Sequence, residues 1–202
     1  SAAVTVAMDD GQYHTIMRHK GWSHEKAREE FWKIYPKQTT SGNAAVGLIV
    51  GIPTAQAAVE NEEGFDRLTF IQKDARLPEM FIQLKAFRHF VLGNGVKANL
   101  ERTSKGLGIA GVFEEIVTSE VVGANKPDPA GYLYIMKKTG LKPEEHLMVG
   151  DREVGDLAPA KKLAMQTCLV TWGKGFEELP KPGKSVDVTI PTPYDLSNVL
   201  NT

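Results

Sequence analysis

Three charged residues in the C-terminal half of the chain are of the types that hold a phosphate and a metal ion together. Lys126 precedes Pro127, and Asp151 and Asp156 stand five residues apart in the segment VGDREVGD at 149–156. Hard divalent cations such as Mg²⁺ prefer one or two carboxylates with water and phosphate oxygens. A lysine neutralises a phosphoryl group as negative charge develops. We therefore expect a metal ion and a phosphoryl group to bind here.

Each of these residues also has a simpler structural explanation. Asp151 suits the cap of a turn and Asp156 the cap of a helix, because short polar side chains bond locally to the backbone. A lone lysine is usually solvated surface. Pro127 favours an extended conformation for Lys126, however, so we expect Lys126 just before the next helix. That helix then fixes the direction in which the lysine side chain points. A lysine and two aspartates in this order favour a functional site.

Apolar segments alternate with helical segments from about residue 86 onward. We expect strands at 89–92, 115–118, 146–149, 167–171 and 186–190, with helices at 96–105, 128–138, 155–163 and 194–200. This alternation is typical of a parallel sheet covered by helices on both faces. Ligands of such sheets bind beyond the carboxyl ends of the strands. Asn94, Asp151 and Trp172 all fall at those ends.

The N-terminal part of the chain is expected to add one strand and a helical insertion. Val4-Thr5-Val6 is predicted as the first strand, which would bring Asp9 to the same edge of the sheet. Helices are expected at 25–35, 44–50, 55–60 and 79–85, with no convincing strand between them. The sequence therefore predicts an α/β core of residues 1–13 and 86–202 and a helical cap of residues 14–85.

Composition excludes several classes of protein. A net charge of -1, without a run of lysine and arginine, gives no indication of nucleic acid as a partner. Cys168 is the single cysteine, so an internal disulfide and a cysteine-based zinc cluster are excluded, and its apolar surroundings predict a buried, inert thiol. No apolar run reaches the ~20 residues of a membrane span. The first residues are too short and polar for a signal peptide, so we expect a cytoplasmic protein.

Four segments resemble motifs of the haloacid dehalogenase superfamily, and the chain is most similar to its small-molecule phosphatases with a helical cap. The segment LGNG at 92–95 matches the second motif, Lys126-Pro127 the third, and Gly150-Asp151 with Asp156 the fourth, while TWG at 171–173 resembles a following loop. The resemblance covers nearly the whole chain and is strongest from residue 90 to 173. It implies a three-layer α/β/α sandwich with a parallel Rossmann-like sheet and a small helical cap inserted after the first strand.

The resemblance also implies an activity and a set of site residues. The activity is magnesium-dependent phosphoryl transfer from small phosphorylated molecules through an aspartyl-phosphate. The implied catalytic residues are Asp9 and Lys126, the phosphate-binding residues are Gly93, Asn94 and Lys126, and the metal ligands are Asp9, Asp151 and Asp156. Gly93 departs from the family pattern, because it stands where the family has a serine or threonine and offers only its backbone N–H.

The first motif of the family is Asp-x-Asp, and the segment AMDDGQY at 7–13 fits it in two registers. In one register Ala7 replaces the nucleophile, Asp9 is the acid/base and Gly11 replaces a threonine. In the other register Asp9 is the nucleophile and Gly11 replaces the acid/base. We prefer the first register, because Tyr13 then falls where family members often carry tyrosine. Either register removes one catalytic group.

Two functions therefore stay open on the sequence. The first is a haloacid dehalogenase-like phosphatase by descent, with impaired or altered catalysis. The alternative is a catalytically inactive pseudophosphatase that binds a ligand or a partner protein, as the residues Ala7, Gly11 and Gly93 suggest. A receiver-like binding module is a third reading, and the helical insertion argues against it. The sequence specifies neither the substrate nor the oligomeric state.

Overall fold

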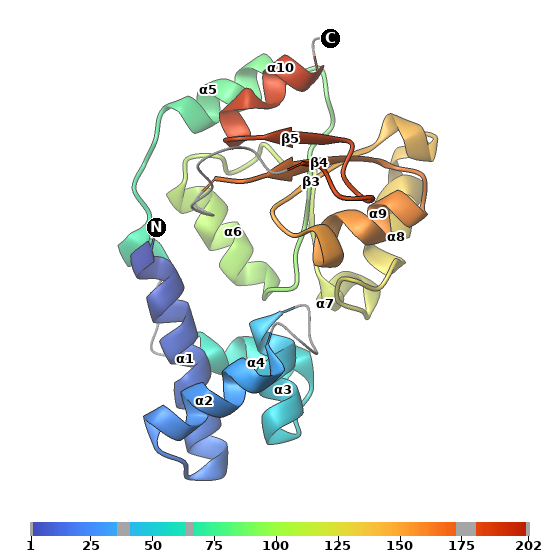
Figure 1. Cartoon of the computed structure of the whole chain (residues 1–202). Coiled ribbons are helices and arrows are strands. Elements are labelled where there is room, and N and C mark those ends of the chain that lie inside the picture. The colour runs from blue at the N-terminus through green and yellow to red at the C-terminus, as the bar shows by residue number, and fades with distance from the viewer. Residues whose placement is uncertain (1, 36–40, 64–66, 173–180, 201–202) are drawn as a thin grey trace. The chain divides into compact units, whose positions relative to one another are not determined.

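The chain divides into two compact units in the computed structural model, which describes residues 2–35, 41–63, 67–172 and 181–200. Unit 1 is Ser1–Ile71 and unit 2 is Gln72–Thr202 (Figure 1). Residues 2–13, which the sequence assigned to the α/β core, lie in a helix of unit 1.

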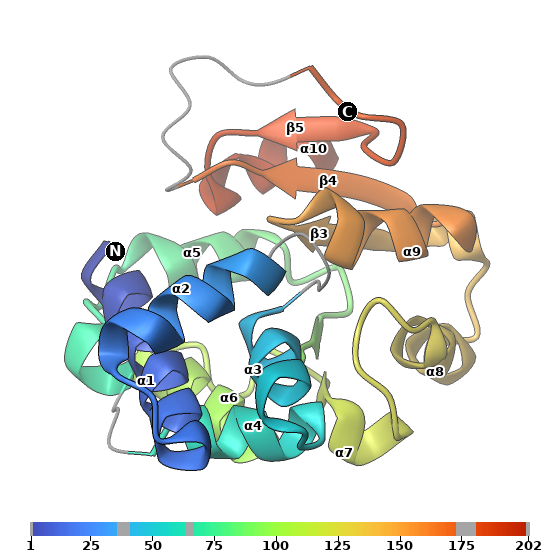
Figure 2. The ribbon, with the colours of Figure 1, turned by 60° about the horizontal axis from the view of Figure 1, so that its bottom comes forward.

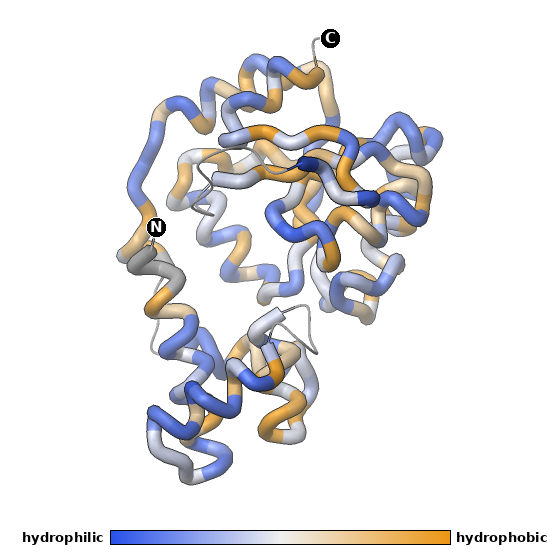
Figure 3. Tube along the Cα trace, in the orientation of Figure 1, coloured by the Kyte–Doolittle hydropathy of each residue, from blue (hydrophilic) through white to orange (hydrophobic). Residues whose placement is uncertain are grey.

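The regular elements among the described residues of unit 1 are all helices. Its elements are α1 (Ala2–Lys20), α2 (His24–Ile34), α3 (Gly42–Val50), α4 (Thr54–Asn61) and a 3₁₀ turn, η1 (Arg67–Phe70). Serine hydroxyls accept from backbone N–H groups at the starts of two helices, Ser23 from Lys26 and Ser41 from Ala44. Ile16, Phe31 and Val46 have no exposed surface, so the apolar faces of α1, α2 and α3 make the core of this unit. Hydrophobic and hydrophilic residues alternate along these helices (Figure 3).

The prediction of a first strand at Val4-Thr5-Val6 is wrong, since these residues lie in α1. Strand propensity of β-branched residues is a weak preference, and tertiary packing overrides it. The buried residues Tyr13 and Ile16 give α1 an apolar face that packs against α2 and α3, and the helix extends from there to Ala2. Asp9 and Gly11 therefore lie inside a helix rather than at the end of a strand.

Unit 2 contains five described strands, all paired in parallel. β1 (Phe90–Leu92) pairs with β2 (Glu115–Val117), while β3 (Leu147–Gly150), β4 (Gln166–Val170) and β5 (Val188–Ile190) form a second group in the order β3-β4-β5. Each of these strands lies where the alternation of apolar segments predicted one. The parallel pairing confirms the α/β fold class.

The helices of unit 2 follow its strands. They are α5 (Arg76–Gln83), α6 (Lys97–Gly106), α7 (Ser119–Val122), α8 (Ala130–Thr139), α9 (Ala158–Lys162) and α10 (Leu196–Leu200), with 3₁₀ turns η2 (Pro143–Glu145) and η4 (Pro193–Asp195) and a π-helical turn η3 (Glu153–Leu157). Figure 2 shows α9 in front of the β3-β4-β5 group and α10 behind it. Helices on both faces of parallel strands give the layers of an α/β/α sandwich.

One apolar core joins the two strand groups of unit 2. Leu92 of β1 and Met148 of β3 both pack against a buried cluster that contains Tyr132 of α8. Gly131 allows α8 to come close to β1, because a Cβ at this position would lie 2.4 Å from Cδ1 of Leu92. The carboxyl ends of β1 and β3 are thereby held in one structural unit.

Two expectations about burial and membranes can be compared with the structure. Cys168 is fully buried in β4, so the prediction of a buried thiol is confirmed, and burial raises the pKa of this thiol to about 11. Among the described residues, no single helix has the length and hydropathy to cross a membrane. The pair α3 and α4, bent by 107° at the break between them, meets that test only when counted together.

Candidate active site

Asn94 follows β1 and binds the backbone of Lys126 at two points. Its side-chain Nδ2 donates to the carbonyl of Lys126 at 2.8 Å, and its Oδ1 accepts from the N–H of Lys126 at 2.7 Å. Two hydrogen bonds from one planar amide fix both the position and the orientation of the segment that carries Lys126. In the structure this amide positions Lys126, and the predicted contact of Asn94 with phosphate stays a prediction.

The side chain of Lys126 ends on the carboxylate of Asp156. Nζ lies 2.7 Å from Oδ1, and the two side chains are only 15% and 10% exposed. The sequence predicted both residues for one site, and the structure brings them into direct contact. The contact itself was not predicted, because the two residues are thirty positions apart and no local pattern indicates it.

The position of Asp156 depends on the backbone around it. Asp156 lies in the π-helical turn η3 that follows β3, an irregular turn that often occurs at functional sites. A Cβ at Gly150 would lie 2.8 Å from Cβ of Asp156, so only glycine leaves space for the aspartate. Tyr132 Oη donates to the carbonyl of Asp156 at 2.8 Å, and burial raises the pKa of this phenol well above its usual range. The tyrosine therefore stays protonated and acts as a donor.

Gly93 and Asp151 lie at the carboxyl ends of β1 and β3, as predicted. The backbone N–H of Gly93 donates to the carbonyl of Val117 at 3.0 Å and so extends the pairing of β1 with β2. That bond engages the one group through which Gly93 was expected to contact phosphate. Asp151 is exposed and directly follows Gly150, the last residue of β3.

Asp9 has a different environment, inside the helical unit. It is half-buried on α1, and burial raises the pKa of its carboxyl. One turn further along the helix is the buried Tyr13, whose hydroxyl accepts from Nε1 of Trp32 at 2.8 Å. Burial, followed by the charge of Asp9, raises the pKa of Tyr13. Asp9 belongs to unit 1 and Lys126 to unit 2, so the predicted role of Asp9 beside Lys126 stays a prediction.

The donor set at β3 fits a magnesium ion of the kind that proteins hold through few ligands. Asp151 and Asp156 supply two hard carboxylates near one strand end, and Mg²⁺ is commonly bound by one or two carboxylates with water and phosphate oxygens. Among the described residues, no group of three or more histidine, cysteine, aspartate or glutamate side chains is arranged to hold a metal ion. Asp151 and Asp156 are therefore the two carboxylates at this strand end that could hold such an ion.

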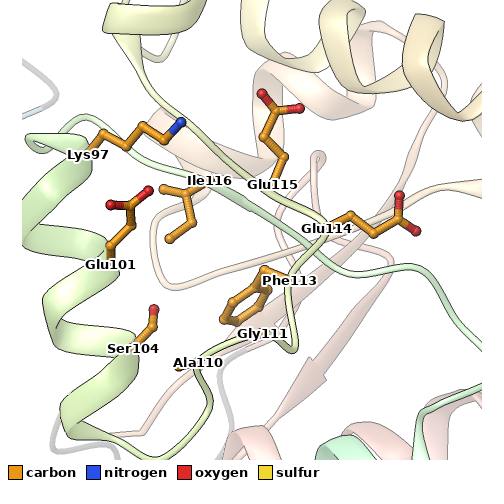
Figure 4. Close-up of a pocket in the computed structure, with 9 residues that line it drawn as sticks. All are labelled: Lys97, Glu101, Ser104, Ala110, Gly111, Phe113, Glu114, Glu115 and Ile116. Carbon is orange, nitrogen blue, oxygen red and sulfur yellow. The ribbon is translucent and has the colours of Figure 1, made fainter.

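A separate pocket lies along α6 and β2. Its volume is about 280 Å³, and the side chains that line it include Lys97 and Glu101 from α6 and Phe113 and Glu115 near β2 (Figure 4). It contains none of the predicted site residues. Glu115 is already paired with Lys138 and accepts from the hydroxyl of Tyr134. The carboxylate of Glu115 thus serves contacts within the chain.

A family model for haloacid dehalogenase-like hydrolases matches residues 12–163. A glyceraldehyde 3-phosphate phosphatase from Methanopyrus kandleri is 36% identical over 95 residues, which are 46% of this chain and 41% of that protein. A phosphoglycolate phosphatase from Aquifex aeolicus is 28% identical over 122 residues, 59% of this chain and 54% of that protein. The chain thus aligns with about half of the length of these relatives.

Solved structures show the same fold. A haloacid dehalogenase-type phosphatase from Thermococcus onnurineus has a TM-score of 0.68 at 21% identity, over 98% of this chain and 89% of that one. The L-2-haloacid dehalogenase from Xanthobacter autotrophicus has a TM-score of 0.59 at 14% identity, over 96% and 93% of the two chains. Similarity at such low identity supports the fold only.

Proposed function

Because the chain belongs to the haloacid dehalogenase-like hydrolase family, we propose that it hydrolyses small phosphomonoesters with the help of Mg²⁺. The observation that carries the proposal is the hydrogen-bonded series from Asn94 through Lys126 to Asp156. This series brings an ammonium and a carboxylate to the strand ends where ligands of parallel sheets bind. The phosphatase names of the relatives support small phosphorylated metabolites as the substrate class.

Lys126 would bind and orient the phosphoryl group. An ammonium has three N–H donors, and the contact with Asp156 fixes the direction of the side chain. The remaining donors suit phosphoryl oxygens, and a fixed positive charge in a partly buried site stabilises the charge that develops there. Asn94 contributes by holding the backbone of Lys126, so its role is positioning rather than contact with the phosphate.

Asp151 and Asp156 would hold the magnesium ion. When bound, the ion supplies positive charge that offsets the phosphoryl oxygens. Hydrolysis through an aspartyl-phosphate also requires a carboxylate nucleophile and an acid/base. We propose Asp9 for one of these roles, as the sequence predicted, and the helical unit as the cap. A cytoplasmic location is also part of the proposal, because the substrates named for the relatives are small phosphorylated molecules.

The proposal is tested by turnover of an aryl phosphate, phosphoglycolate and glyceraldehyde 3-phosphate with Mg²⁺. We expect Lys126→Met and Asp151→Asn to abolish most activity, and Asp9→Asn to lower it about a hundredfold or more if it is the acid/base. Asp10→Asn is the matched control, because Asp10 neighbours Asp9 and pairs instead with His24 on the surface.

The two functions that the sequence left open predict opposite results. Turnover by the unmodified chain that depends on Lys126 would exclude the pseudophosphatase. Full activity in Asp9→Asn and Asp151→Asn would show that these roles are misassigned. A chain that binds phosphate but never turns it over would favour the pseudophosphatase.

A further inference from the structure

Trp172 is an exposed aromatic residue at the carboxyl end of β4. Its relative exposure is 57%. The register of β3 with β4 pairs Gly150 with Leu169, so Asp151 is level with Val170 and Trp172 follows two residues later. The neighbouring strands β3 and β4 are spaced about 4.8 Å apart. Asp151 and Trp172 therefore follow adjacent strands at the same carboxyl edge of the sheet.

The neighbours of Trp172 hold its ring in place. The ring packs edge-to-face against Tyr194 of η4, with 5.7 Å between the ring centroids. Tyr194 is itself fixed, because its hydroxyl donates to Asp74 at 2.9 Å and the guanidinium of Arg76 lies over its ring at 4.5 Å. Arg76 is in turn paired with Asp74. The indole thus rests on a built support and still presents more than half of its surface.

From this placement we infer that Trp172 contacts the leaving group of the substrate and favours phosphomonoesters whose leaving group has an aromatic or apolar face. The inference rests on the proposed function, because it assumes that the phosphoryl group binds at Lys126 and Asp151. A rigid indole at the rim gives a ring or an alkyl face a surface to pack on. A small, fully polar leaving group has no apolar face that could pack on the indole.

The test is equilibrium binding of phenylphosphonate and methylphosphonate, with Mg²⁺ present, to the whole chain and its variants. We expect Trp172→Ala to bind phenylphosphonate about threefold to tenfold more weakly, the range of a single aromatic contact, and methylphosphonate unchanged. Trp172→Phe should keep most of the preference, because it restores an aromatic face. Leu141→Ala is the matched control, since Leu141 is an exposed apolar residue that precedes β3 at the opposite edge of the sheet.

Each outcome decides between the inference and the function on which it rests. If Trp172→Ala weakens both phosphonates equally, or neither, the inference is overturned. Lys126→Met should abolish binding of both compounds, and if it does not, or if the unmodified chain binds neither, the proposed phosphate site is wrong. Methylphosphonate binding that needs Lys126, with a phenyl preference that does not need Trp172, would leave the function standing and reject only the inference.

Discussion

The ion pair of Lys126 and Asp156 predicts how single substitutions in the candidate site change the stability of the fold. Both side chains are largely buried, so either charge left alone would be costly, whereas an apolar pair in their place is tolerated. We expect Lys126→Met or Asp156→Leu alone to lower the free energy of unfolding by about 3–5 kcal/mol, and the double variant to recover most of that loss. Denaturant unfolding of all four proteins measures this coupling.

The control for this prediction is an ion pair of the same length on the surface. Lys33 and Glu30 are also 2.7 Å apart, but their side chains are 53% and 33% exposed. Lys33→Met should change the free energy of unfolding far less than Lys126→Met does, because solvent screens the exposed pair. If the two single losses at the buried pair simply add in the double variant, Lys126 and Asp156 do not stabilise each other as the structure implies.

Asp9 gives a prediction about pH. Burial raises its pKa, so the folded state holds the proton more tightly than the unfolded state does. The free energy of unfolding therefore has its full contribution from Asp9 below the ordinary aspartate pKa of about 3.9, and loses it as pH rises through the raised value. Asp9→Asn should be more stable than the unmodified protein at neutral pH, by less than about 1 kcal/mol because the side chain is partly solvated.

Thermal unfolding of the two proteins across the acidic range checks this prediction. Their difference should vanish well below pH 3.9, where both side chains are neutral. A variant that is less stable than the unmodified protein at neutral pH would show that the ionised carboxylate of Asp9 makes a stabilising contact. That result would contradict the cause assigned to the raised pKa.

At the scale of elements, the contact between α1 and α4 explains the glycine in the middle of α1. A Cβ at Gly11 would lie 2.4 Å from the backbone oxygen of Asn61. Gly→Ala within a helix usually stabilises by about 0.5–1 kcal/mol. Here the added methyl meets a backbone that cannot turn aside, so we expect Gly11→Ala to destabilise by about 1–3 kcal/mol in denaturant unfolding.

Gly93→Ala is the comparison for that variant. A Cβ at Gly93 would lie 2.7 Å from Cδ1 of Leu100, the end of a flexible side chain that can rotate away. Its effect on the free energy of unfolding should therefore be smaller, below about 1 kcal/mol.

A stabilising effect of Gly11→Ala would show that α1 and α4 pack less closely than the structure has them. The contact also means that a threonine at position 11, as the family pattern has in one register, would not fit this helix.

At the scale of the whole molecule, the two units have separate cores. Phe31 has no exposed surface in unit 1, and Tyr132 is 1% exposed in unit 2. Phe31→Ala should cost about 3–5 kcal/mol and speed hydrogen exchange in α1 to α4, with exchange in β3, β4 and α8 unchanged. Tyr132→Ala should instead speed hydrogen exchange in β3, β4 and α8 and leave exchange in α1 to α4 unchanged. Faster exchange in both units from either variant would mean that the chain unfolds as one cooperative body.

Strong periodicity made most elements predictable. The helix expected at 25–35 is α2 (His24–Ile34), and the strand expected at 89–92 is β1 (Phe90–Leu92). In such segments the spacing of apolar residues and the capping residues are enough to predict the type and the approximate bounds of the element. The strand predicted at Val4-Thr5-Val6 is wrong because three β-branched or apolar residues carry too little signal to oppose a long helix. The π-helical turn at Asp156 was missed because it has no pattern of its own.

The family and the parallel α/β class could be read from the sequence alone, because motif spacing and strand alternation are local properties. The tertiary structure decided that Asn94 holds the backbone of Lys126 and that Asp156 pairs with its ammonium, because these contacts join segments about thirty residues apart. It also decided that Asp9 lies within a helix. The packing of α1 against its neighbours, and not the propensity of its first residues, set that outcome.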